Sequence, residues 1–116
     1  MNNYCTLFNS HYLSRGLALY RSLLKRAQDF HLYIFAFDEA TYQVLIALKL
    51  AKVTVVSLAE FETPALLKVK SQRTVAEYCW TSTAAVILHC LNRYQLAAVC
   101  YLDADLYFWQ DPALLV

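Results

Sequence analysis

Two aspartates, Asp103 and Asp105, are separated by a single residue and directly follow an apolar run, residues 97–102. Residues two apart in a β-strand share a face, so a strand that continues through this run would point both carboxylates the same way. The last residues of a buried strand emerge from the core, where a charge costs little desolvation. Mg²⁺ and Mn²⁺ prefer oxygen ligands and complete their coordination with waters and substrate phosphates. The pair therefore predicts a site for a metal-bound phosphate.

Strands and helices alternate along the rest of the chain. Short apolar runs predict four strands, over residues 4–8, 31–37, 53–58 and 97–102. Apolar residues at helical spacing predict the helices between them, over residues 13–27, 38–49, 63–69 and 74–91. Capping chemistry supports these helices, because Asp38 and Thr63 are good N-caps and Thr74 with Glu77 matches a capping box. Asp111 and Pro112 are expected to begin one more helix.

Buried strands that alternate with helices are typical of a parallel sheet covered on both faces. We therefore expect an α/β fold of the Rossmann-like kind, with a mostly parallel sheet in the strand order 3-2-1-4. In this order the carboxyl ends of the first and fourth strands open a crevice that binds ligands. Asn9 and Asp103 should face that crevice, and Asp38 should lie at its rim.

Length and composition limit the possible architectures. The 116 residues suit a single domain, residues 1–116. Hydrophobic residues make up 59% of the chain and charged residues 16%, so the excess of apolar side chains must belong to a core or to an interface. We expect a dimer through exposed apolar surface, and we expect the chain to be truncated at its C-terminus. No stretch reaches the roughly 18 uncharged apolar residues of a membrane-spanning helix.

Charge and cysteine content argue against two other classes of protein. The net charge of +1 supplies no basic field, which disfavours nucleic-acid binding. None of the four cysteines belongs to a Cys-x-x-Cys pair, which disfavours a zinc site. Unpaired cysteines in apolar surroundings and a start without signal-peptide features favour a cytoplasmic location.

Three segments carry a resemblance to a known family: the run from Glu77 to Thr83, the run from Tyr101 to Phe108, and Asp111-Pro112. Together they resemble the donor half of a nucleotide-diphospho-sugar transferase. The chain is similar over its whole length to the N-terminal half of GT-A glycosyltransferases, of the sort grouped in glycosyltransferase family 8. The resemblance implies a metal-dependent enzyme that transfers sugar from a nucleotide-diphosphate sugar, expected to be a UDP-sugar, to an unknown acceptor. The acceptor site and the other catalytic groups follow the Asp-x-Asp motif in that family, so this chain alone should be inactive.

The resemblance also implies roles for particular residues. Asp105 would ligate a Mn²⁺ or Mg²⁺ ion on the donor diphosphate, and Asp103 would touch the ion or the ribose. Arg73 corresponds to a basic residue near the donor phosphates, and Asp38 to an acid beside the nucleotide base. The end of the first strand, from Thr6 to Asn9, would cradle the nucleoside, largely through its backbone.

Other interpretations of the same residues remain open. Asp38 is as well explained by helix capping, and Arg73 by simple solvation. Haloacid dehalogenase phosphatases also carry Asp-x-Asp behind an apolar strand, as nucleophile and general acid, although their motif opens the domain. A response-regulator receiver should carry its acid pair after the first strand, where Asn9 and Ser10 stand here. A non-catalytic interaction module would use the apolar surface alone.

Overall fold

The computed structural model describes residues 2–109, and within that range it describes residues 75, 76, 79 and 80 by their backbone alone. The helix expected at Asp111 and Pro112 lies outside the described residues. The strands are β1 (Asn2–Phe8), β2 (Phe30–Ala36), β3 (Val53–Val56) and β4 (Cys100–Tyr101). The helices are the 3₁₀ turn η1 (Ser10–Tyr12), α1 (Leu13–Arg26), α2 (Glu39–Leu48), α3 (Leu58–Phe61), α4 (Pro64–Lys70) and α5 (Val75–Arg93).

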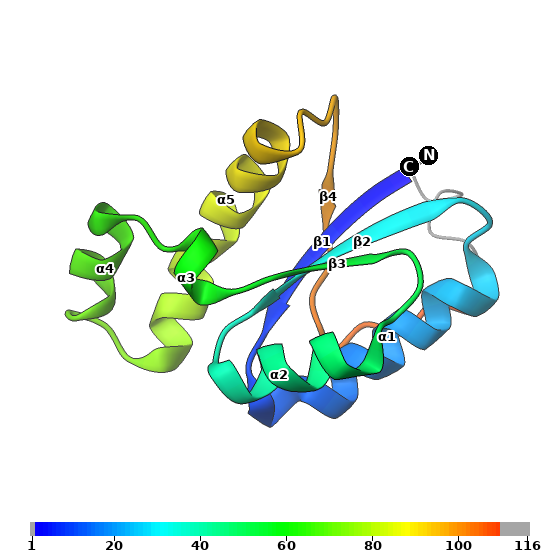
Figure 1. The fold of residues 1–116 in the computed structure, drawn as a ribbon, viewed down its shortest axis with the longest axis horizontal. Helices are drawn as coiled ribbons and strands as arrows, with labels where there is room; N and C mark the ends of the chain where they lie inside the picture. The colour runs from blue at the N-terminus through cyan, green and yellow to red at the C-terminus, as the bar shows by residue number, and fades with distance from the viewer. Residues whose placement is uncertain (1, 110–116) are drawn as a thin grey trace.

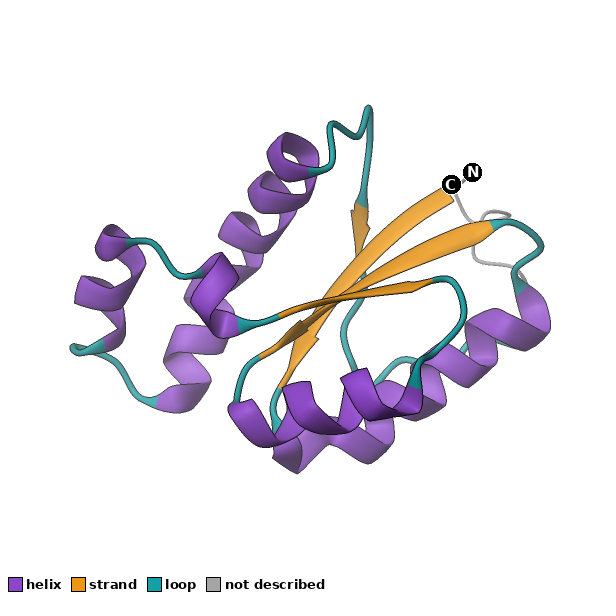
Figure 2. Cartoon of the chain, in the orientation of Figure 1, coloured by secondary structure: helices purple, strands orange, loops and turns teal. Residues whose placement is uncertain are grey.

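The strands form one parallel sheet in the order β3-β2-β1-β4, so the predicted α/β fold and strand order are confirmed (Figure 1). Helices α1 and α2 lie on one side of the sheet, and α3 and α5 lie on the other (Figure 2). Because every pairing is parallel, the carboxyl ends of all four strands meet at one edge of the sheet. That edge is where the predicted site residues on β1, β2 and β4 should converge.

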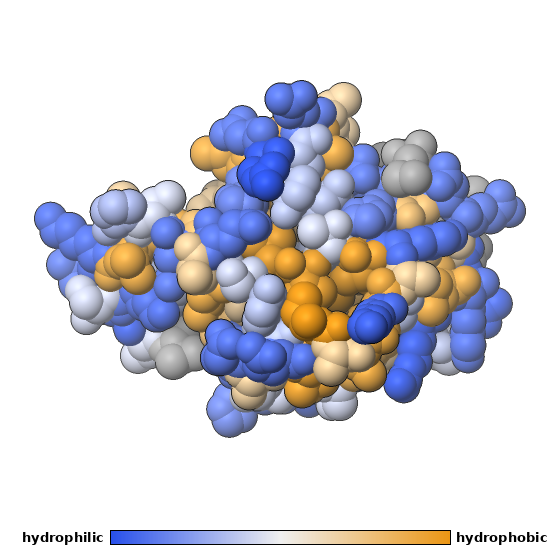
Figure 3. All heavy atoms as spheres, viewed as in Figure 1, coloured by the Kyte–Doolittle hydropathy of each residue, from blue (hydrophilic) through white to orange (hydrophobic). Residues whose placement is uncertain are grey.

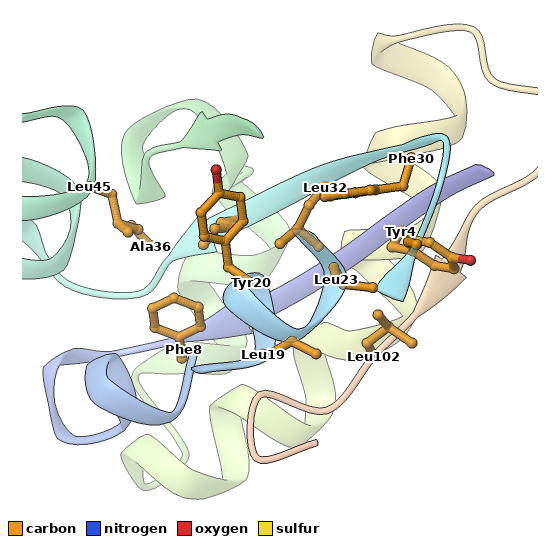
Figure 4. Close-up of a cluster of buried hydrophobic side chains, with 12 residues drawn as sticks. Tyr4, Phe8, Leu19, Tyr20, Leu23, Phe30, Leu32, Ala36, Leu45 and Leu102 are labelled. Carbon is orange, nitrogen blue, oxygen red and sulfur yellow. The ribbon is translucent and has the colours of Figure 1, made fainter. Parts of the chain in front are cut away.

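Alternation along the strands builds a core on each face. On β1, Tyr4 and Phe8 belong to the core under α1, whereas Cys5 and Leu7 belong to the core under α5. Figure 4 shows part of the α1-side core, in which Tyr4, Phe8, Leu19, Tyr20, Leu23, Phe30, Leu32, Ala36, Leu45 and Leu102 are labelled. The α5-side core is rich in aromatic rings, such as Phe35 and Phe61, whose centroids lie 5.3 Å apart edge to face.

Gly16 explains how closely α1 approaches the sheet. A Cβ atom at this position would lie 2.3 Å from Cε2 of Phe8, well inside van der Waals contact. The missing side chain therefore lets the Phe8 ring, which is only 2% exposed, pack directly against the helix backbone. This contact fixes the last residue of β1, the residue before Asn9.

Two elements differ from the sequence-based expectations. The fourth strand was predicted over residues 97–102, but β4 covers only Cys100–Tyr101, and both Ala97 and Ala98 are exposed. Alanine has low strand propensity and little surface to bury, so the pairing with β1 begins late. The third strand was predicted to reach residue 58, but it ends at Val56, and Ser57 caps the short helix α3 instead. In the described part of the chain, no helix has the length and apolar character needed to cross a membrane.

Candidate functional site

Asp103 and Asp105 lie on a tight turn immediately after β4. The Leu102 N–H donates to the carbonyl of Cys5 at 2.8 Å, so the chain still runs beside β1 at that residue. The Leu106 N–H donates to the carbonyl of Asp103 at 3.1 Å, which closes a β-turn over residues 103–106. We call this segment the acidic turn. Strand alternation, from which we expected both carboxylates to point the same way, therefore does not apply to them, because they occupy the first and third positions of a turn.

The two carboxylates of the acidic turn are exposed, whereas the turn itself is anchored. Ala104, between them, and Phe108, just beyond, pack against the α1-side core. Within residues 2–109 neither carboxylate makes a side-chain hydrogen bond or an ion pair. Among the described residues, no group of three or more histidine, cysteine, aspartate or glutamate side chains is arranged so that it could hold a metal ion. The turn thus presents two carboxylates as hard oxygen ligands. A divalent cation held there would take its other ligands from groups other than these described side chains.

Tyr101 contributes to the electrostatics behind the turn. Burial raises the pKa of its hydroxyl to about 12, with a further rise from the negative charge of Asp103. Hydrogen bonds with the Thr83 side chain and the Leu7 backbone lower this pKa, but not enough to reverse the shift. The phenol therefore stays neutral at physiological pH, and it ties β4 to α5 and to β1 beside Asp103. The net negative charge at this edge comes from the carboxylates, which suits a cation.

The end of β1 turns sharply at Asn9. The Asn9 Oδ1 atom accepts a hydrogen bond from the His11 N–H at 3.0 Å, and its carbonyl accepts from the Tyr12 N–H at 3.1 Å. Both bonds begin η1, so the side chain is used to shape the loop. The residue is only 9% exposed.

Thr6 is also predicted to line the nucleoside site, and it is completely buried. By strand alternation its side chain is on the α1 side with Tyr4 and Phe8. Its Oγ1 atom has no hydrogen-bond partner among the described residues. A ligand at the strand ends could therefore meet Thr6 through backbone contacts, as the resemblance implies, while the hydroxyl faces the core.

Asp38 connects the ends of β1 and β2. One of its carboxylate oxygens accepts from the Thr41 N–H at 2.8 Å and caps α2, and the other accepts from the Ser10 N–H at 2.9 Å. Partial burial alone raises the pKa of Asp38, but the hydrogen bonds from Thr41 and Ser10 outweigh it and lower the pKa to about 2. The capping role is thus observed. Asp38 also holds the loop that follows Asn9, through the hydrogen bond from the Ser10 N–H.

We expect Asp38→Ala to destabilise the fold by about 1–2 kcal/mol at pH 7, because it removes the cap of α2 and the acceptor of Ser10. The lowered pKa sets the pH dependence. The stabilisation is complete above the usual pKa of 3.8 and is lost as the pH falls through about 2. Urea denaturation of both proteins at neutral pH and at successively more acidic pH measures this difference. A difference that stays constant as the pH approaches 2 would contradict the assignment.

Arg73 is exposed in the loop between α4 and α5. It precedes a capping box in which Thr74 and Glu77 hydrogen-bond reciprocally, as predicted. The bonds from Thr74 lower the pKa of Glu77, and the charge of Arg73 adds to that shift. Among the described residues no hydrogen bond or ion pair joins Arg73 to Asp103 or Asp105. Arg73 therefore makes no direct bond with the acidic turn, and it lies just before α5.

The structure brings together some predicted residues and adds others. It joins the loop after Asn9 to Asp38 through the Ser10 N–H, and it puts Leu102, the residue before the acidic turn, beside Cys5 of β1. Ser10, Thr83 and Tyr101 were not predicted as site residues, although they hold these loops and strands in place. Ser10 is the second residue after the end of β1, and this position is a usable sequence signal. The hydrogen bond between Thr83 and Tyr101 joins a helix to a strand, and no local sequence pattern predicts it.

No protein-family model matches the chain. The chain is 36% identical over 112 residues to the uncharacterized protein YfnD of Bacillus subtilis (strain 168). It is 38% identical over 111 residues to the uncharacterized protein YfnF of the same strain. These alignments cover 96% and 95% of the chain but only 36% and 37% of the two relatives. The chain thus spans little more than a third of the length of these relatives.

Proposed function

We propose that this chain is the donor-binding part of a metal-dependent glycosyltransferase and that its ligand is a nucleotide-diphosphate sugar, expected to be a UDP-sugar. The observation that carries the proposal is the acidic turn, with two exposed carboxylates at the carboxyl edge of a parallel sheet. The turn follows β4 directly, and β4 pairs with β1 at the point where the reversal of strand order favours a ligand crevice. The resemblance in the segments around Tyr78 and Tyr101 supports the same function.

The residues present fit a Mn²⁺ or Mg²⁺ ion. Asp103 and Asp105 supply anionic oxygens that no described side chain already engages. Few protein ligands are expected, because such ions keep waters and substrate phosphates in their coordination shell. When bound, the ion would act as a Lewis acid that stabilises the charge on the departing diphosphate.

The remaining residues are proposed to position the donor. The backbone from Thr6 to Asn9 would cradle the nucleoside at the end of β1, with Asp38 at its rim fixing the loop through Ser10. Arg73, near the N-terminus of α5, would offset diphosphate charge. We place the reaction in the cytoplasm, since the described cysteines, Cys5, Cys90 and Cys100, are all free thiols. The acceptor would be bound by other parts of a longer protein, so this chain should bind the donor without transferring its sugar.

Isothermal titration calorimetry tests the proposal. UDP-glucose and UDP-galactose are titrated into the chain in Mn²⁺, in Mg²⁺ and in EDTA. We expect binding with either metal and at least about 10-fold weaker binding in EDTA, because the ion links two anionic partners. Equal affinity in EDTA, or no binding in any condition, would refute the proposal. Release of phosphate from p-nitrophenyl phosphate would instead favour the phosphatase alternative.

A further inference from the structure

The outer edge of β3 carries backbone groups that the described sheet leaves unused. β3 ends the sheet, and its described pairing is with β2 alone. The Leu32 N–H donates to the carbonyl of Lys52 at 2.9 Å, and Leu32 is level with Val53. In a parallel ladder of this register, Thr54 turns its N–H and C=O toward β2, while Val53 and Val55 turn theirs outward. No hydrogen bond to a described residue engages those outward groups.

Apolar side chains border this edge. Figure 3 shows them gathered at the centre of the face that β3 crosses in Figure 1, beside α2. Val53 and Val55 are half-buried and pack against the α1-side core. A β-branched edge strand with an apolar flank and no proline is suited to pair with another strand.

Lys52, the charged residue next to this edge, does not prevent another strand from pairing with it. Lysine beside an edge strand usually opposes association with other strands. The Lys52 Nζ atom lies 5.1 Å from the centroid of the Phe30 ring, so its charge is held toward the start of β2. On the α5 side of the sheet, the Thr54 hydroxyl is hydrogen-bonded to Nε2 of His31 at 2.7 Å, so it needs no further partner.

We infer that β3 is a self-association surface, on which a second copy of this chain adds its own β3 in antiparallel pairing about a twofold axis through Thr54. Val53 of each copy then faces Val55 of the other, and each such pair exchanges two backbone hydrogen bonds. The outward groups are symmetric about Thr54, which makes the strand complementary to itself in this orientation. The Lys52 charges stay with their own Phe30 rings, so the pairing brings no like charges into contact. The contact is isologous, so it closes as a dimer.

This inference is independent of the proposed function, and sedimentation velocity over low-micromolar to near-millimolar concentrations tests it. The average mass should rise from that of one 13.4 kDa chain toward twice that value. Val55→Pro should remain monomeric, because proline removes an outward N–H and spares the bonds to β2. Hydrogen exchange of the parent chain provides a second measurement, in which the amides of Val53 and Val55 should exchange more slowly as concentration rises.

Thr54→Lys provides a second variant if Val55→Pro does not fold, because the twofold axis puts residue 54 of one copy opposite residue 54 of the other, where two like charges repel, and the backbone is unchanged. It too should remain monomeric. Leu88→Lys is the matched control, since Leu88 is 58% exposed on α5, away from β3, and its replacement should leave dimerisation intact. A parent chain that stays monomeric throughout overturns the inference. So does a dimer that persists in Thr54→Lys, or one that Leu88→Lys dissociates.

Discussion

Asp103→Asn combined with Asp105→Asn is expected to abolish the metal-dependent binding of a UDP-sugar. Both side chains keep their size, and the turn itself is closed by a backbone bond from the Leu106 N–H to the Asp103 carbonyl, so the fold should be unaffected. Asparagine offers a neutral oxygen in place of an anionic one and is a poorer ligand for Mn²⁺. Even outer-shell partners of metal ligands are typically worth about 10–100-fold in affinity, so the loss of both ligands should cost at least about 100-fold. Calorimetry in Mn²⁺ measures the change.

Asp29→Asn is the matched control for this experiment. Asp29 is an exposed aspartate in the turn before β2, at the opposite end of the sheet from the acidic turn. The same substitution there should leave binding at the parent value. Thermal unfolding followed by circular dichroism checks that all variants are folded. Parent-like affinity of the double variant in Mn²⁺ would mean that the acidic turn is not the metal site, whatever the parent chain binds.

The strand order could be predicted because it depends on patterns that extend over whole elements. Buried runs alternate with amphipathic helices, and the crossover rules leave few arrangements. The length of β4 could not be predicted, because residues 97–102 are apolar throughout while pairing with β1 engages only two of them. The helix α3 carried a signal that was overlooked, since Ser57 and Glu60 have the spacing of a capping box.

The sequence predicted where the candidate site residues lie along the chain, but it did not predict how their side chains are arranged. Asp103 and Asp105 follow the fourth strand as expected, yet their relation to each other depends on a turn that begins when β4 ends. Asp38 had two interpretations, and the coordinates show that it caps α2 while also binding Ser10. The burial of Thr6 follows from alternation with Tyr4 and Phe8, whereas its missing hydrogen-bond partner depends on how α1 packs. Tertiary contacts of this kind leave no local trace in the sequence.

Gly16→Leu should be the most destabilising substitution proposed for this chain. A side chain at this position must enter the space of the Phe8 ring, whose atoms lie 2.3–2.7 Å from the site of the Cβ. Overpacking of a core typically costs about 1–3 kcal/mol, and leucine adds three more carbons to that overlap. We therefore expect a loss of about 3 kcal/mol or more, which is a large fraction of the about 5–15 kcal/mol of stability that a domain has. Urea denaturation measures the change in free energy of unfolding.

Gly16→Ala permits a sharper test, because two effects of opposite sign compete in it. Alanine favours a helix over glycine by about 1 kcal/mol, while the overlap with Phe8 opposes it by more, so the variant should be less stable than the parent. In a Phe8→Ala background the overlap disappears, and Gly16→Ala should then be stabilising.

Ser14→Ala is the control, because Ser14 is exposed on the same helix, and it should change stability by less than about 0.5 kcal/mol. If Gly16→Ala stabilises the parent as well, the packing of α1 on the end of β1 is looser than the structure indicates. The same contact would then not fix the loop at Asn9.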